Sequence, residues 1–193
     1  MNRDEVRDIL ENALDFEWQT QGFGMIRTYL PGEGEPRLQV WDQRIAVPSN
    51  NTIHDHPWAF TSQIIAGMIY NQRYGLAPNP VSGDNGYMTQ ITPGVKGGFL
   101  SEQEVIPCRI KPWPVEVYSM GGTYSQTHRE LHMTKYLQFT VTLITRTERE
   151  EADKATIAWY GKPEDQPVFV NPAAAERNLV ERITEEALAT WWL

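Results

Sequence analysis

Eight stretches of the chain are rich in β-branched and aromatic residues, and clusters of Gly, Pro, Asn and Asp separate them. Such residues suit the pleated, half-buried surface of a sheet, and the residues between them are typical of turns. The stretches are residues 24–30, 37–47, 62–74, 87–92, 104–111, 115–120, 136–146 and 155–160. So many strands in a chain of 193 residues favour a sandwich or a barrel. We therefore expect an all-β protein made of antiparallel strands.

The first residues of the chain carry a helix-start signal. Asn2 is followed three residues later by Glu5, which is the spacing of a capping box. Apolar residues then share one helical stripe, and these are Val6, Ile9, Leu10 and Leu14. The pattern predicts a short helix over residues 3–15.

A second helix is expected at the other end. Asn171 and Pro172 are a favoured N-cap and first-turn pair, and the apolar residues after them recur with a period near 3.6. The pattern predicts an amphipathic helix over residues 172–191. We expect the barrel to cover about residues 20–165 and residues 1–193 to form one domain. A domain of this size buries roughly 70% of its unfolded surface.

Composition excludes several classes of partner. The chain has 25 acidic and 17 basic residues, a formal charge of −8, so it lacks the basic surface that neutralises nucleic-acid phosphates. No apolar stretch approaches the roughly 20 residues that span a bilayer. A single cysteine, Cys108, and a charged first segment without an apolar leader favour a cytoplasmic protein. A small-molecule partner is the expectation that remains.

The four histidines of the chain fall in two clusters, His54 with His56 and His128 with His132. A lone histidine on a strand is more often a packed or surface residue than a metal ligand. Alternate side chains of a strand share one face, however, so His54 and His56 can bind one ion together. His128 and His132 have the same parity if the chain is extended there. We therefore expect a site of three or four imidazoles, which suits Fe, Zn, Ni or Cu.

Two motifs around these histidines resemble those of the cupin superfamily. The stretch "IHDHPWAF", followed by the strand "SQIIAGMIYNQRY", is similar to the first cupin motif, and "GGTYSQTHRE" is similar to the second, with His128 in the third-ligand position. The resemblance covers about residues 20–148. It implies an antiparallel jelly-roll barrel that holds a metal ion between the H-x-H pair and a histidine from a later strand.

Within the superfamily, "SNNTIHDH" and "HRE" most resemble thiol dioxygenases of the cysteine dioxygenase type and a set of uncharacterised bacterial and phage cupins with an "HDHPW" core. The positions of the glutamate ligand found in many cupins hold Phe60 and Thr61 here, so the site resembles the three-histidine version. His128 is favoured as the third ligand because Arg129 follows it, as in the dioxygenases. His132 then either lies behind the ligands and supports them or is itself a fourth ligand.

The resemblance implies a mononuclear Fe(II) dioxygenase that acts with O₂ on a small organic acid, thiol or diketone-like compound. Zn, Ni and Mn are the alternative metals. A Zn-dependent isomerase or lyase and a non-catalytic metal- and ligand-binding cupin are the alternative functions, and a homodimer is common among cupins. Arg27 is expected to bind a substrate carboxylate, and Tyr124 is expected to serve as a proton donor near the bound substrate. Cysteine is disfavoured as the substrate, because "TVTLITR" lacks the histidine and tyrosine that cysteine dioxygenases carry there.

Overall fold

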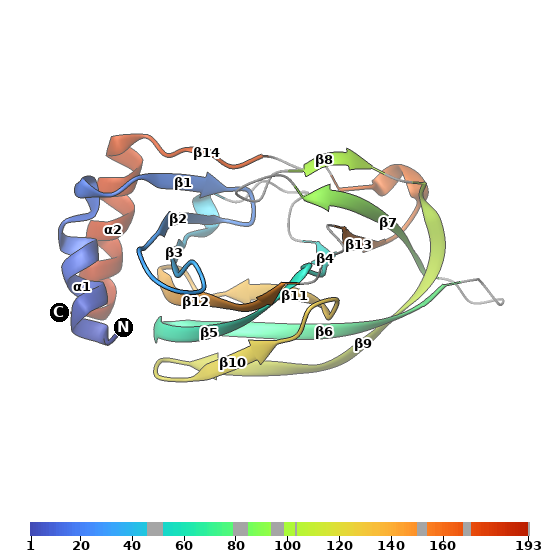
Figure 1. Cartoon of the computed structure of the whole chain (residues 1–193), viewed down its shortest axis with the longest axis horizontal. Coiled ribbons are helices and arrows are strands. Elements are labelled where there is room, and N and C mark those ends of the chain that lie inside the picture. The colour runs from blue at the N-terminus through green and yellow to red at the C-terminus, as the bar shows by residue number, and fades with distance from the viewer. Residues whose placement is uncertain are drawn as a thin grey trace.

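The structure is a computed structural model in which antiparallel strands form two seven-stranded sheets (Figure 1). It describes residues 1–45, 52–78, 85–93, 99–102, 104–149, 154–167 and 171–192. All strand pairings among these residues are antiparallel. The prediction of an all-β protein with antiparallel strands is therefore confirmed.

Sheet A has the strand order β10-β5-β12-β3-β2-β1-β14. Its strands are β10 (Thr123–Gln126), β5 (Trp58–Ala66), β12 (Thr140–Arg149), β3 (Arg37–Trp41), β2 (Met25–Tyr29), β1 (Trp18–Gln21) and β14 (Ala173–Ala174). Its four central strands correspond to predicted runs, whereas β1, β10 and β14 are short strands that the residue pattern did not predict.

Sheet B has the order β13-β4-β11-β6-β9-β7-β8, and β13 also pairs with β7, so six of its strands close into a barrel. Its strands are β13 (Ala155–Tyr160), β4 (Ile53–His54), β11 (Leu131–Tyr136), β6 (Met68–Pro78), β9 (Ile106–Ser119), β7 (Gly86–Pro93) and β8 (Phe99–Glu102). A barrel is thus present, while its jelly-roll connectivity stays a prediction.

The predicted strand over residues 62–74 is two strands, β5 and β6, which belong to different sheets. Gly67 joins them with φ +81°, a left-handed conformation that costs glycine little. A Cβ atom at Gly67 would lie 2.5 Å from Thr140 Oγ1 and 2.9 Å from Thr140 Cα. Glycine therefore lets the chain turn from sheet A into sheet B against the start of β12.

The N-terminal helix forms as predicted in its first turns. Helix α1 (Arg3–Glu11) has the expected capping box, because Asn2 Oδ1 accepts from the Glu5 N–H and the Glu5 carboxylate accepts from the Asn2 N–H. The rest of the predicted segment is the 3₁₀ helix η1 (Ala13–Asp15). Two further 3₁₀ turns are η2 (Gln43–Ile45) and η4 (Pro163–Asp165).

The C-terminal helix α2 (Arg177–Trp191) begins five residues later than predicted. Ala173 and Ala174 form β14 and pair with Thr20 and Gln19 of β1, so the chain is extended where the Asn-Pro pair suggested a helix start. Pairing with an existing sheet edge outweighs the local capping signal. In the part of the chain that the structure describes, no helix combines the length and apolar character needed to span a membrane.

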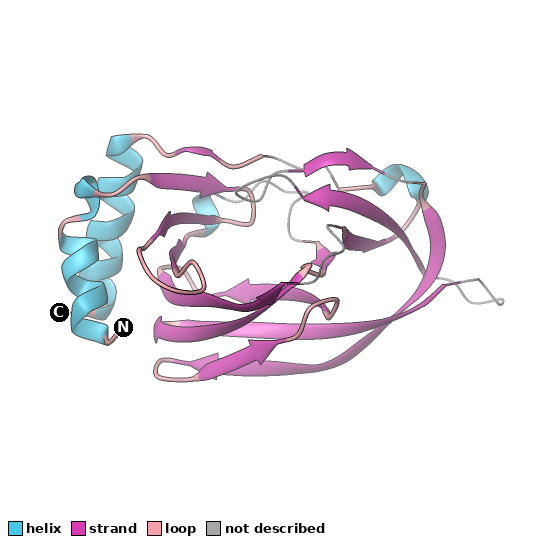
Figure 2. Ribbon diagram, in the orientation of Figure 1, coloured by secondary structure: helices cyan, strands magenta, loops and turns pink. Residues whose placement is uncertain are grey.

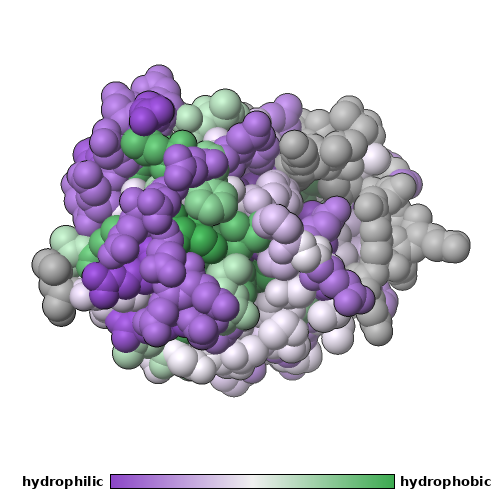
Figure 3. Space-filling model, turned by 60° about the vertical axis from the view of Figure 1, so that its left-hand side comes forward, coloured by the Kyte–Doolittle hydropathy of each residue, from purple (hydrophilic) through white to green (hydrophobic). Residues whose placement is uncertain are grey.

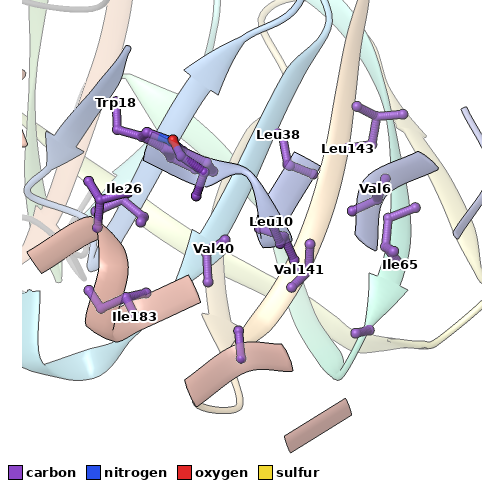
Figure 4. Packing of buried hydrophobic residues seen from close by; sticks show 14 of the residues in the cluster. Val6, Leu10, Trp18, Ile26, Leu38, Val40, Ile65, Val141, Leu143 and Ile183 are labelled. Atoms are coloured by element: carbon purple, nitrogen blue, oxygen red, sulfur yellow. The ribbon is translucent and has the colours of Figure 1, made fainter. Parts of the chain in front are cut away.

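Both helices lie at one end of the molecule (Figure 2) and cover the outer face of sheet A. Apolar side chains of α1, α2 and alternate strand positions pack there, including Val6, Leu10, Ile26, Leu38, Val40, Val141 and Ile183 (Figure 4). On the face turned forward in Figure 3, hydrophobic residues are visible at the surface and hydrophilic residues surround them. Because strand side chains alternate, the other residues of β2, β3 and β12 face sheet B.

Candidate metal centre

The backbone brings His54 opposite His132. His54 lies in β4, the two-residue strand between β11 and β13, and its Cα pairs with that of His132 on one side and of Ile157 on the other. Directly opposed residues of an antiparallel pair point to the same face of the sheet. The side chains of His54 and His132 therefore meet although the residues are far apart in sequence.

Asp55, between the two histidines of the H-x-H motif, fixes this segment to β13. Its N–H donates to the Thr156 carbonyl at 3.0 Å, and its Oδ1 accepts from the Thr156 N–H at 2.6 Å. The carboxylate is buried, so the bond is charge-assisted and shielded from water. Asp55 thus holds the backbone that carries His54 and His56.

His54, His56 and His132 form one group whose ligand atoms all lie within 4.8 Å of one another. His56 Nε2 and His132 Nε2 are 3.3 Å apart. Two nitrogens that each lie about 2.1 Å from one ion, at an angle of about 90° to 109°, are roughly 3.0 to 3.4 Å apart. The observed separation fits two imidazoles that share one metal ion.

Hydrogen bonds at the other ring nitrogens orient two of these imidazoles. His54 Nδ1 lies 2.9 Å from the Thr52 carbonyl oxygen, and His132 Nδ1 lies 3.0 Å from Asn71 Oδ1. Both partners are oxygen acceptors, so these contacts favour the tautomer with the proton on Nδ1 and the lone pair on Nε2. Asn71 is fully buried. Such partners fix the tautomer and orientation of metal-binding histidines.

Burial keeps the three histidines neutral. It is the main cause that lowers the pKa of His54, and it holds the pKa of His56 and of His132 well below the ordinary value. The other two imidazoles, Arg37 and Arg146 lower the pKa of His56 further. His54 and Arg73 do the same for His132. A histidine must be neutral to bind a metal ion. The group is therefore ready to bind one without first releasing protons at neutral pH.

Aromatic rings enclose the group. Phe23 stacks on His54 with ring centroids 5.0 Å apart, and Trp58 stacks on His56 at 4.1 Å. Phe60 contacts both His56, at 5.6 Å, and His132, at 6.0 Å. Phe60 thus places an apolar ring beside two of the three imidazoles.

Among the described residues, the group contains His132 in the place where we expected His128. His128 lies in the turn between β10 and β11. Arg129 has φ +63°. The Glu130 carboxylate accepts a hydrogen bond from the Thr127 N–H, and the Glu130 carbonyl accepts one from the Gln126 side chain. The chain is not extended here, so the parity argument that equated the two histidines does not apply. His132 replaces His128 as the third member of the group.

Arg27 and Tyr124, the two other predicted site residues, are both buried. Arg27 lies on β2 with its guanidinium 5.4 Å from the Tyr29 ring, and burial is the main cause that lowers its pKa. Tyr124 lies on β10 behind Phe60, at 6.0 Å between ring centroids. Burial raises the pKa of Tyr124 to about 12. Their roles toward a substrate stay predictions.

Residue patterns did not single out Asn71, Arg37 or Arg146. His132 was among the predicted ligands, and a signal that favours it over His128 was present, because "LHMTKY" is a β-rich run whereas "SQTHRE" consists of residues common in turns. No protein-family model matches this chain, and no curated protein sequence matches it.

Proposed function

We propose that this protein is a cupin that binds one metal ion through His54, His56 and His132, and that with Fe(II) it acts as a dioxygenase on a small organic anion. The distance of 3.3 Å between His56 Nε2 and His132 Nε2, with Nδ1 of His132 bonded to Asn71, is the observation that carries the proposal. The jelly-roll connectivity belongs to the same proposal.

An Fe(II) ion held by three neutral imidazoles would keep its positive charge and leave coordination positions open for O₂ and an anionic substrate. The chain's own contribution is the environment. Phe23, Trp58 and Phe60 surround the histidines with apolar rings, which exclude water from the reacting groups. Arg27 supplies a buried cation on the facing sheet for a substrate carboxylate.

Oxygen uptake tests the function. The protein is loaded anaerobically with Fe(II), small carboxylates and thiols are added one at a time, and O₂ consumption is followed after air is admitted. A dioxygenase consumes O₂ with one of these compounds, and His132→Ala abolishes the consumption. If metal binds but none of the compounds causes O₂ uptake, the oxygenase assignment is wrong, and a Zn-dependent or non-catalytic cupin takes its place.

A further inference from the structure

Three arginines lie together on the face of sheet A that faces sheet B. Arg27, Arg37 and Arg146 come from the adjacent strands β2, β3 and β12. Arg37 pairs with Tyr29 on one side and Ile144 on the other, which places Arg27 and Arg146 on its two diagonals. Arg27 and Arg37 are 3% and 4% exposed. These three residues are called the arginine cluster below.

Among the described residues, Arg37 and Arg146 carry more positive charge than the carboxylates paired with them. Arg37 makes no ion pair with any residue that the structure describes, and its Nε has no hydrogen-bond partner. Arg146 pairs with Glu35, whose side chain is 64% exposed, and the Arg146 Nε is also buried without a partner. Burial and the two neighbouring arginines lower the pKa of Arg37 to about 10. Buried cations of this kind normally have a carboxylate or another anion beside them.

Trp58 connects the cluster to the histidines. The Arg37 and Arg146 guanidiniums each lie 4.7 Å from the Trp58 ring, and the same ring stacks on His56. A cation over a tryptophan ring is attracted by it but keeps its charge. Trp58 therefore contacts both two arginines of the cluster and one histidine of the group.

We propose that the arginine cluster binds a small molecule with two negative charges close together, a dicarboxylate or a phosphate, and that this dianion is the substrate of the histidine site. Guanidiniums match the planar and bidentate geometry of carboxylate and phosphate oxygens. One arginine suffices for a single carboxylate. Arg37, which is buried and makes no ion pair with a described residue, lies beside Arg146, whose counter-ion Glu35 is exposed, and this pair of cations suits a dianion. The assignment of this dianion as a substrate rests on the proposed function, while its binding does not.

The test measures anion binding without metal. Chelator-treated full-length protein is titrated calorimetrically with succinate, inorganic phosphate and acetate at constant ionic strength. We expect succinate or phosphate to bind at least tenfold more tightly than acetate, and the stronger of the two identifies the source of the charge. Equal affinities for acetate and both dianions would overturn the proposal.

Variants separate a ligand-binding role from a structural one. Arg37→Met should weaken dianion binding at least tenfold and leave the melting temperature of the ligand-free protein equal or higher, because it removes a buried charge without an ion pair. Arg7→Met, which alters an exposed arginine paired with Glu11, should change neither. If Arg37→Met does not fold, Arg146→Met provides the affinity readout. Retained dianion affinity in the folded variant would contradict the proposal.

The binding test is independent of the metal. His132→Ala should lose metal and keep dianion affinity, because His132 is outside the arginine cluster. If the wild-type protein consumes O₂ with a monoanionic compound but binds no dianion, the arginine proposal fails and the dioxygenase proposal stands. If dianions bind and no compound causes O₂ uptake, the proposal that the arginine cluster binds a dianion stands and the dioxygenase proposal fails.

Discussion

His56 Nε2 and His132 Nε2 face each other at 3.3 Å although 76 residues separate them. With its Nδ1 bonded to Asn71, His132 presents the lone pair of Nε2 to His56, so either the N–H of His56 or a cation must face it at this distance. Two separate contacts hold them there. Asp55 fixes the segment that carries His56 to β13, and Asn71 bonds to the His132 ring. These two contacts keep the imidazole nitrogens at a separation that one metal ion can bridge.

The first prediction compares the two histidines of the second cluster. His132→Ala should reduce the metal content of the purified protein at least severalfold, because it removes one of three ligands. His128→Ala should leave the metal content near that of the wild type, since His128 is outside the group. Elemental analysis of the two variants, purified in parallel, measures the difference. A loss of metal in His128→Ala alone would restore our sequence-based assignment.

The second prediction concerns Asn71, which binds the His132 ring from behind. Asn71→Leu removes the acceptor for Nδ1 and should lower metal affinity about 10- to 100-fold, as loss of such partners does elsewhere. Asn71→Asp keeps an oxygen acceptor and should retain most of the affinity. Competition with a chromogenic chelator gives the affinities of both variants. Equal affinity in Asn71→Leu and wild type would show that Asn71 does not orient the ligand.

Local patterns were enough to predict much of the fold and the pairing of two of the three histidines in the group. The capping box at Asn2 and Glu5 depends on residues three positions apart, and the shared direction of His54 and His56 depends on the parity of neighbouring positions. Both relations are contained within one element, so the residue order alone indicates them. The all-β class follows similarly from residue types that recur in each strand.

Relations between distant segments could not be predicted in this way. His132 joins His54 through the register of β4 with β11, which depends on the turn that Glu130 holds together. Arg37 and Arg146 meet only because β3 pairs with β12. Neither register leaves a trace in the local pattern, and each of these arginines resembles an ordinary strand residue. The predicted start of α2 was wrong for the same reason, because the pairing of β14 with β1 keeps residues 173 and 174 extended.

The third prediction uses two glycines with similar backbone angles. Gly67 has φ +81° and its Cβ would collide with Thr140, whereas Gly121 has φ +83° and nothing lies within 4 Å of its Cβ. Gly121→Ala should lower the free energy of unfolding by about 1 kcal/mol, the cost of a left-handed alanine. Gly67→Ala should lower it by about 2 to 4 kcal/mol, because overpacking adds to the strain. Urea unfolding of both variants measures the difference, and equal losses would show that the contact with Thr140 relaxes.

The fourth prediction concerns acid sensitivity of the metal-free protein. Burial lowers the pKa of His54, His56 and His132 in the folded state, so the unfolded chain binds protons more readily than the folded one. Above an unfolded pKa of about 6.5 these histidines are neutral in both states and stability does not depend on them. As the pH falls below that value, the free energy of unfolding should decrease, by about 1.4 kcal/mol per pH unit for each histidine that stays neutral.

Replacement of two histidines isolates this effect from the titration of carboxylates. In the double variant His56→Gln and His132→Gln, the decrease in the free energy of unfolding between about pH 6.5 and 5.5 should be smaller by about 2 kcal/mol, because two of the histidines that resist protonation in the folded state are gone. Chemical unfolding of chelator-treated wild type and variant at three pH values within this window gives the two slopes. The same slope in both proteins would mean that these histidines titrate alike in the folded and unfolded states, which is incompatible with a buried neutral group.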